Sequence, residues 1–398
     1  MLGPAFVAAV AYVDPGNVGA NLSAGAQYGY ALTWVLVVAS AIAAILQYQS
    51  AKLGLVTGRS LTSLVHERLT TRTRSPGWGR AYGLQAFLIA IATDLAEVVG
   101  GALALNLLFG TPLWLAGIIV GVVSVLLLRA LRMKGEHAFE LAVAAVLGLV
   151  AAGFWGALAF APPSPGKLAA GLVPQVPDTQ AWPMIAAMLG ATVMPHAIYL
   201  HSTLAIDRYR PHGPLTHPLR PLLSAQKWDV GVSLLVAGSV NIAMLLLAAE
   251  TLPGTVGEAV EAAHRIFMIE LGPAAATIFA LGLLASGVGS TVVGTHAGSQ
   301  VLKDLLPKTP SPAARRLLTL APAVLVLLAG VPPTTILVAS QTVLSFGIAA
   351  AVIPLALFTR DRSIMGDHAD GRAMTLVSGL IALLVVALNI MTLVSVFA

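Results

Sequence analysis

The sequence predicts an all-α membrane protein in which eleven helices cross the bilayer as a single bundle. Three observations support this fold class. Of the 398 residues, 57% are hydrophobic and only 10% are charged, whereas soluble domains carry about one-quarter charged residues. The mean hydropathy is +0.87. The apolar runs reach the roughly 20 residues that a helix needs to cross a hydrocarbon core of about 30 Å.

Each apolar run is one expected span, and we expect the whole chain, 1–398, to form one transmembrane domain. We expect the first and the sixth run to be broken helices, interrupted at Pro15 and Pro195. We expect no cleavable signal peptide, because Asp14 interrupts the first run and no basic region precedes it. The expected spans, in chain order, are 2–27, 31–51, 82–108, 112–129, 139–160, 182–205, 230–249, 271–301, 316–330, 334–358 and 374–396.

The basic residues predict the orientation of the chain. All Lys and Arg residues except Lys167 and Arg265 lie in the connections that follow even-numbered spans. The positive-inside rule therefore places these connections and the N-terminus in the cytoplasm, and the C-terminus outside the inner (cytoplasmic) membrane. The formal net charge of +5 is thus a topology signal, and we expect no nucleic-acid partner. The chain starts directly at the first span, so we expect a cytoplasmic extension before it in the natural protein.

Two further features of composition narrow the chemistry. The chain has no cysteine, which excludes disulfides, thiolate metal sites and cysteine nucleophiles. The connection 206–228 contains several prolines and histidines, and we expect it to be irregular. Its histidines, His212 and His217, could bind metal, but a solvated linker is the better interpretation.

The two interrupted spans stand at corresponding positions of two halves. Spans one to five cover residues 1–160, and spans six to ten cover residues 182–358. The second set must cross the membrane in the opposite sense, which makes the halves an inverted repeat, and helix 374–396 stands outside it. Two proline-broken helices at corresponding positions are a sequence pointer to a binding site near the middle of the bilayer.

Both breaks share the pattern Ala-x-Val-x-Pro, at residues 11–15 and 191–195. Proline removes a backbone donor, and in hydrocarbon the freed carbonyls are tolerable only where they line a cavity or meet a ligand. The first break places the carboxylate of Asp14 and the amide of Asn17 beside these carbonyls, and the second places the thioether of Met194 there. This mixture of hard oxygen and soft sulfur suits a first-row transition-metal dication better than Mg²⁺ or Ca²⁺.

Asp14 and Met194 could each also have a purely structural role. An aspartate before Pro-Gly is common in turns, and methionine usually fills a core. The membrane-length apolar flanks argue against a turn for Asp14, whose ionised side chain would cost at least ~2.5–3.5 kcal/mol at the bilayer centre. The repeat places Met194 opposite Asp14, which favours a ligand role for the thioether.

Other polar residues within spans suggest a proton route. Asp94 and Glu97 lie at i and i+3 on one face of the third span, where carboxylates typically mark ion pathways or proton relays. A structural ion pair with Arg315 or Arg316 is the alternative. His196 and His201 suit proton handling, although each could equally be a hydrogen-bonded histidine of the bundle.

Two neutral polar residues lie within later spans. For Gln341 and Asn241, hydrogen bonding between helices is the default interpretation, and lining the transport path is the alternative.

Taken together, these motifs resemble the paired signature of the Nramp family of divalent-metal/proton symporters. The motifs that carry the resemblance are Asp14-Pro15-Gly16-Asn17, Thr93-Asp94-Leu95-Ala96-Glu97 and Met194-Pro195-His196. The resemblance covers the whole chain and implies a LeuT-like fold with broken helices 1 and 6.

The resemblance also implies roles for individual residues. The implied metal site comprises Asp14, Asn17, Met194 and the backbone carbonyls of Ala11 and Ala191, with Gln341 joining in some states. The implied proton route comprises Asp14, Asp94, Glu97 and Arg316, with His196 and His201 adjacent.

Two positions refine this comparison with the family. Many members carry a further acid two turns before the aspartate of helix 3, where this chain has Phe87. The retained Met194 argues against the Mg²⁺-type relatives, which lose this methionine.

The sequence thus predicts a proton-coupled importer of Mn²⁺, with Fe²⁺ and Cd²⁺ also accepted, that works by alternating access. We expect no enzymatic activity, no cofactor and no obligate protein partner; the partners are metal ions, protons and the lipid bilayer. A symporter of an organic solute with the same architecture is the first rival. An intramembrane metalloenzyme using His196, His201 and Asp14 is a remote one, since no His-Glu-x-x-His pair is present.

Overall fold

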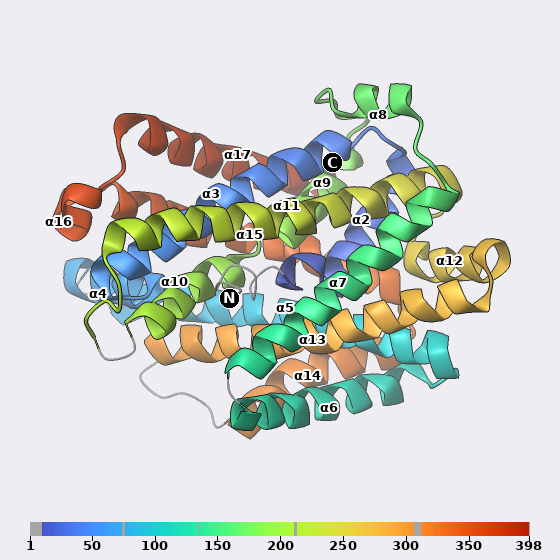
Figure 1. Ribbon diagram of the computed structural model, residues 1–398, viewed down its shortest axis with the longest axis horizontal. Helices are drawn as coiled ribbons and strands as arrows, with labels where there is room; N and C mark the ends of the chain where they lie inside the picture. The colour runs from blue at the N-terminus through green and yellow to red at the C-terminus, as the bar shows by residue number, and fades with distance from the viewer. Residues whose placement is uncertain (1–9, 74–75, 135, 211–212, 306–311, 398) are drawn as a thin grey trace.

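The computed structural model describes residues 10–73, 76–134, 136–210, 213–305 and 312–397, and these residues form helices joined by short connections, with no β-strand among them (Figure 1). The elements are η1 (Val10–Val13), α2 (Pro15–Tyr28), α3 (Thr33–Thr57), α4 (Leu61–Thr73), α5 (Pro76–Phe109), α6 (Leu113–Lys134), α7 (Glu136–Phe160), α8 (Pro165–Gly171), α9 (Ala181–Thr192), α10 (Pro195–Tyr209), α11 (Leu219–Thr251), α12 (Ala259–Ile266), η2 (Phe267–Leu271), α13 (Pro273–Leu305), α14 (Pro312–Leu328), α15 (Pro333–Thr359), α16 (Arg362–Met365), η3 (Gly366–His368) and α17 (Arg372–Phe397).

The helix interruptions fall where proline predicts them. Both α2 and α10 begin with proline at the first helical position, where the fixed φ of proline suits a helix start and its missing N–H is no loss. With 12 and 15 residues, α9 and α10 are about 18 Å and 22 Å long at 1.5 Å per residue. Neither alone crosses a hydrocarbon core of about 30 Å, so the broken pair forms one span.

The broken helices lie at the centre of the bundle. Of the apolar stretch within Ala181–Tyr209, 94% is buried inside the bundle, whereas only 22% of the apolar stretch of α17 is buried. The helix that follows each break packs against a long helix of the other half of the chain: α2 packs against α11, and α10 packs against α3. In addition, α5 packs along α13. In Figure 1, α17 lies at one edge of the molecule, and α6 and α14 lie at the opposite edge. The two breaks are therefore enclosed by protein.

Seven helices of the described residues are long and apolar enough to cross a membrane. The apolar stretches Leu113–Leu127, Leu147–Phe160 and Leu318–Leu328, in α6, α7 and α14, are shorter. The predicted break in the first span is present, but only its part from Val10 onward is described. The all-helical fold class is confirmed, whereas the count of eleven spans stays a prediction.

The expectation of an irregular connection 206–228 was wrong for its second half, because α11 begins at Leu219. Proline at position 221 falls in the first turn, where a backbone N–H has no partner within the helix. Leu222 and Gln226 lie one turn apart and are both buried, so this turn packs on the bundle. His217 lies before the helix, and His212 lies outside the described residues.

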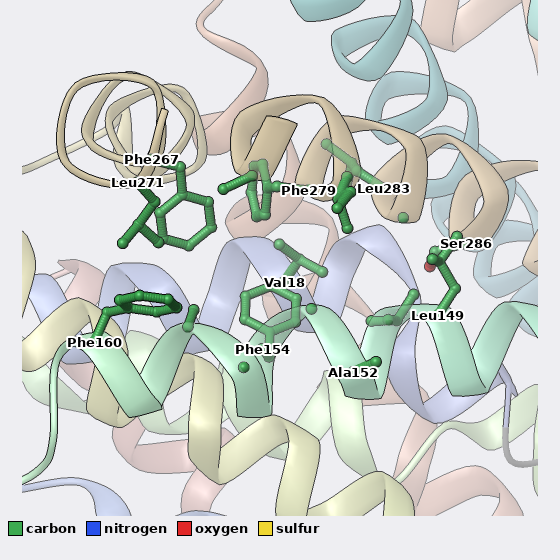
Figure 2. Close-up of a pocket in the computed structure, with 17 residues that line it drawn as sticks. Val18, Leu149, Ala152, Phe154, Phe160, Phe267, Leu271, Phe279, Leu283 and Ser286 are labelled. Atoms are coloured by element: carbon green, nitrogen blue, oxygen red, sulfur yellow. The ribbon is translucent and has the colours of Figure 1, made fainter. Parts of the chain in front are cut away.

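A cavity of about 320 Å³ lies between α7, α13 and η2. In Figure 2, Phe154 of α7 lies opposite Phe279 of α13, Phe160 lies opposite Phe267 and Leu271, and Val18 lies between the two helices. The cavity is lined mainly by carbon atoms and lies on the side of α7 where Phe160 is exposed. It therefore lacks the ligands that a metal ion needs.

Candidate metal site

Asp14 and Asn17 form a compact polar pair at the first break. Asp14 is the N-cap of α2 and has extended backbone dihedrals. Its Oδ1 accepts hydrogen bonds from the Asn17 backbone N–H at 2.7 Å and from Asn17 Nδ2 at 2.8 Å. Asp14 is 2% exposed and Asn17 is fully buried. The turn interpretation of Asp14 is therefore correct as local structure, but this turn lies inside the bundle and its carboxylate faces the protein centre.

The second break supplies a carbonyl and a thioether. Residue 195 is proline, so the carbonyl of Ala191 lacks the N–H that would bond it four residues later in a helix. This carbonyl accepts a hydrogen bond from Asn17 Nδ2 at 2.9 Å instead. Met194 is the N-cap of α10, has no capping hydrogen bond from its side chain and is 1% exposed. The hydrogen bond from Asn17 joins the two breaks directly.

Side chains from the second half of the chain bond two other carbonyls of the first break. The carbonyl of Tyr12 accepts from Asn241 Nδ2 at 2.9 Å, and the carbonyl of Val13 accepts from Ser286 Oγ at 2.6 Å. Of the two alternatives given for Asn241, the structure shows hydrogen bonding between elements; Ser286 was not predicted. Their signal was a buried polar side chain within an apolar span, since such a group needs a partner in hydrocarbon. Ala11 lies in η1, and its side chain lies outside the described residues.

Gln341 of α15 reaches the same region. It is fully buried, and a methyl group added at Gly16 would collide with its side-chain amide. A methyl group added at Gly190 would collide with the backbone carbonyl of Gln341. Gln341 Oε1 has no hydrogen-bond partner. The two glycines thus let α15 approach both breaks, and the amide oxygen of Gln341 is available beside Asp14.

The Asn17 amide turns its nitrogen, and not its oxygen, toward the neighbouring groups. Its nitrogen donates to Asp14 and to the Ala191 carbonyl, while Oδ1 is buried without a partner. Both neighbours are acceptors, so this orientation satisfies them. The amide nitrogen therefore links the Asp14 carboxylate to the Ala191 carbonyl.

The predicted proton-route residues lie on helices around the breaks. Thr93 Oγ1 lies 3.2 Å from His196 Nδ1, which places α10 beside the acid motif of α5. Asp94 and Glu97 are buried, at 6% and 1% exposure. A methyl group at Gly294 of α13 would lie 2.8 Å from Glu97 Oε1. The structure therefore brings the acid motif, His196 and α13 together.

A second polar chain joins α10 and α3 to the first break. His201 Nδ1 lies 2.6 Å from Gln47 Oε1, and Gln47 Nε2 donates to the Tyr12 hydroxyl. All three residues are buried, and Gln47 was missed by the sequence analysis. Arg316 belongs to α14, but its side chain lies outside the described part of the chain, so its predicted place at the end of the proton route stays a prediction.

The chemistry of this site is unusual for a metal centre. Among the side chains that the structure describes, no three His, Asp or Glu residues come together in a way that could hold a metal ion. The site around Asp14 instead offers one carboxylate, two amides, a freed carbonyl and a thioether. Together these groups carry only one formal negative charge.

Comparison with known proteins decides the family. The Nramp family, "Natural resistance-associated macrophage protein-like", matches residues 5–395. The chain belongs to this family. It is similar to the divalent metal cation transporter MntH of Mycobacterium tuberculosis, with 48% identity covering 98% of this chain and 90% of the relative. The corresponding transporter of Yersinia pestis is 40% identical, covering 99% and 95%.

Solved structures support the same family and fold. A crystal structure of the Eremococcus coleocola manganese transporter, in complex with an aromatic bis-isothiourea substituted compound, matches with a TM-score of 0.84 and 26% identity, covering 97% of this chain and 84% of that chain. Mhp1, a nucleobase-cation-symport-1 family transporter, matches with a TM-score of 0.61 and 15% identity, covering 99% and 90%. This Nramp chain therefore has a LeuT-like fold and is an integral membrane protein.

Proposed function

We propose that this Nramp protein imports Mn²⁺ by proton-coupled symport and also accepts Fe²⁺ and Cd²⁺. The observation that carries the proposal is the meeting of the two breaks, where Asn17 joins Asp14 to the carbonyl of Ala191. The relatives named above are divalent metal cation transporters and a manganese transporter. Their names describe transport and not catalysis, which supports a non-enzymatic role for this chain.

We assign the cation to the space bounded by Asp14, Asn17, Met194 and the carbonyls of Ala11 and Ala191, with Gln341 joining in some states. Asp14 supplies the formal charge, and the other groups supply neutral donors. The thioether favours Mn²⁺, Fe²⁺ or Cd²⁺, because sulfur offers little to Mg²⁺ or Ca²⁺. These hard ions also demand more oxygen ligands than the two breaks provide.

Cation entry requires a change at Asn17. In the described arrangement the amide N–H groups point at two of the proposed ligands. Rotation of the amide by about 180° exchanges its nitrogen and oxygen, which turns the unpartnered Oδ1 toward the cation. In this proposal, ligand contacts to the cation replace the hydrogen bonds that Asn17 makes to Asp14 and to the Ala191 carbonyl.

The proton route that we propose starts at Asp14 and continues through Asp94 and Glu97 toward Arg316. The contact of Thr93 with His196 supports it, because it brings the second break within one residue of Asp94. His196 and His201 then lie along the route as proton-handling neighbours. Asp14 belongs to both the metal site and the proton route, since a dication that binds its carboxylate expels any proton held there.

We propose alternating access by eleven spans, of which the first ten form an inverted repeat of two five-span halves. The exchange of partners between halves, α2 with α11 and α10 with α3, is the packing expected when residues 1–160 and 182–358 are related by a pseudo-two-fold axis. Helix α17 stands outside this repeat. The positive-inside rule supports a cytoplasmic N-terminus, an external C-terminus and a place in the inner membrane.

One experiment tests the proposal against its rivals. Purified protein is reconstituted into liposomes that contain a chelating dye, and Mn²⁺ entry is recorded with and without an inward proton gradient. We expect Mn²⁺ entry that the gradient accelerates, together with acidification of the lumen. An organic-solute symporter or a metalloenzyme would give no Mn²⁺ entry above that of empty liposomes, and equal rates with and without the gradient would refute the coupling.

A further inference from the structure

A basic pocket lies at one end of the bundle, away from the metal site. It has a volume of about 480 Å³ and lies between α3, the start of α11 and η3. In Figure 1, α16, which directly precedes η3, and the start of α11 lie at the same end of the molecule. The lining residues are Tyr48, Arg220, Leu223, Ser224, Lys227, Asp367 and His368.

The cations of this pocket share one face of α11. Arg220, Ser224 and Lys227 lie at i, i+4 and i+7, so they follow one another along that face. Lys227 Nζ lies 5.5 Å from the centre of the Tyr48 ring, a cation–π contact that holds the ammonium over α3. Among the described side chains, no carboxylate forms an ion pair with Arg220 or Lys227. Two cations therefore line this cavity without an ion-pair partner among the described side chains.

The neighbouring acids do not remove this excess of positive charge. Asp370 is bound by Lys52, whose Nζ lies 2.7 Å from Asp370 Oδ1. Asp367 is the single acid that lines the pocket. It leaves the pocket with a net positive charge and offers a carboxylate to hydroxyl donors.

Exposed apolar side chains locate the pocket relative to the membrane. Along α11 the first large exposed hydrophobic residue is Trp228, at 74%, followed by Val232 and Leu235. Along α17, Leu376 and Leu380 are 68% and 64% exposed. On both helices these residues follow the pocket-lining segments, and tryptophan is typical of the interface. The pocket therefore opens at the level of lipid headgroups.

We propose that this pocket binds the headgroup of an anionic glycerophospholipid of the cytoplasmic leaflet, such as phosphatidylglycerol. The lipid phosphate lies between Arg220 and Lys227 with Ser224 as a further donor, and the glycerol hydroxyls donate to Asp367. Basic pockets between transmembrane helices on the cytoplasmic side bind such headgroups. A bound lipid would tie α3, α11 and the segment before α17 together.

Native mass spectrometry of the full-length protein tests the site. Detergent-purified protein is mixed with equal amounts of phosphatidylglycerol and phosphatidylcholine, and bound lipid is counted. Each basic residue near an anionic lipid contributes about 1 kcal/mol, so Arg220→Gln with Lys227→Gln should weaken phosphatidylglycerol binding by about 30-fold. The matched control is Arg360→Gln with Arg362→Gln, which removes two exposed cations outside the pocket and should bind as the parent does.

Two further measurements distinguish lipid binding from binding of other anions and from misfolding of a variant. Inorganic phosphate and glycerol phosphate should neither displace the lipid nor raise the thermal midpoint, whereas phosphatidylglycerol should raise it in parent and control. Equal binding by the parent and the pocket variant, equal losses in both variants, or stabilisation by free phosphate as large as that by the lipid would each overturn the proposal. Because the readout is lipid binding, the proposal can fail or stand independently of metal transport.

Discussion

The break in the first half of the chain is charged, whereas the break in the second half is neutral. Both follow the same backbone scheme, in which proline begins the outgoing helix and frees a carbonyl one turn earlier. At the first break, Asp14 caps α2 and bonds Asn17. At the second break, Met194 stands at the equivalent position without a capping hydrogen bond. The side chain at the first break is therefore used as a helix cap, whereas the side chain at the second break has no capping role.

The largest expected effect is that of Asp14→Ala. Loss of an N-cap typically costs about 0.5–2 kcal/mol, so the protein should remain folded, whereas the proposed site loses its only formal charge. Mn²⁺ binding by calorimetry and uptake into dye-loaded liposomes should both fall to background. The control is Asp361→Ala, which removes the aspartate that caps α16 through the Ser363 N–H at 2.9 Å. Robust uptake by Asp14→Ala would show that the charged break is only structural.

The second largest effect is expected from Pro195→Ala, which tests whether the freed Ala191 carbonyl is a metal ligand. In Pro195→Ala, the new N–H can bond the Ala191 carbonyl as in a continuous helix and compete with Asn17 and the cation. We expect Mn²⁺ affinity to fall about tenfold, which corresponds to about 1.4 kcal/mol. Pro333→Ala removes the first proline of α15, where no break follows, and should bind Mn²⁺ as the parent does. Unchanged affinity in Pro195→Ala would exclude this carbonyl as a ligand.

Asp94→Asn separates the cation from the proton. Asp94 lies on α5 beside Thr93, which contacts His196, and we do not place it among the metal ligands. We therefore expect Mn²⁺ affinity within about twofold, or ~0.4 kcal/mol, of the parent, with far fewer protons entering per ion. The measurement pairs calorimetry with a pH-sensitive dye in the same liposomes. Loss of Mn²⁺ binding as complete as in Asp14→Ala, with unchanged proton entry per ion, would contradict the relay role.

The smallest effect on Mn²⁺ is expected from Met194→Ala, which tests selectivity. Without sulfur the site offers mostly oxygen, which hard ions accept more readily. Mn²⁺ uptake should persist, Cd²⁺ binding should weaken, and Ca²⁺ should begin to inhibit uptake. Met188→Ala removes a fully buried methionine of α9 that lies before the break and serves as the control. Identical Ca²⁺ inhibition curves for the parent and Met194→Ala would assign selectivity to cavity size or hydration.

Local sequence was enough to locate the two breaks and seven of the apolar spans. A proline has a fixed φ and no N–H wherever it stands, so the starts of α2 and α10 follow from Pro15 and Pro195. The pairing of Asp14 with Asn17 is also local, since three positions at a helix start bring the cap to the N–H. The start of α11 was missed, because burial of Leu222 and Gln226 against the bundle outweighed the signal of the prolines.

Only the tertiary structure decided the partners of the freed backbone groups. Asn241 and Ser286 bond the carbonyls of Tyr12 and Val13 across more than 200 positions of sequence. The periodicity of the sequence does not predict these hydrogen bonds, because they depend on how α11 and α13 pack against the first break. The orientation of the Asn17 amide has the same origin. Its own sequence position allows either atom to face the cavity, and the carbonyl of Ala191, supplied by the other half of the chain, selects the nitrogen.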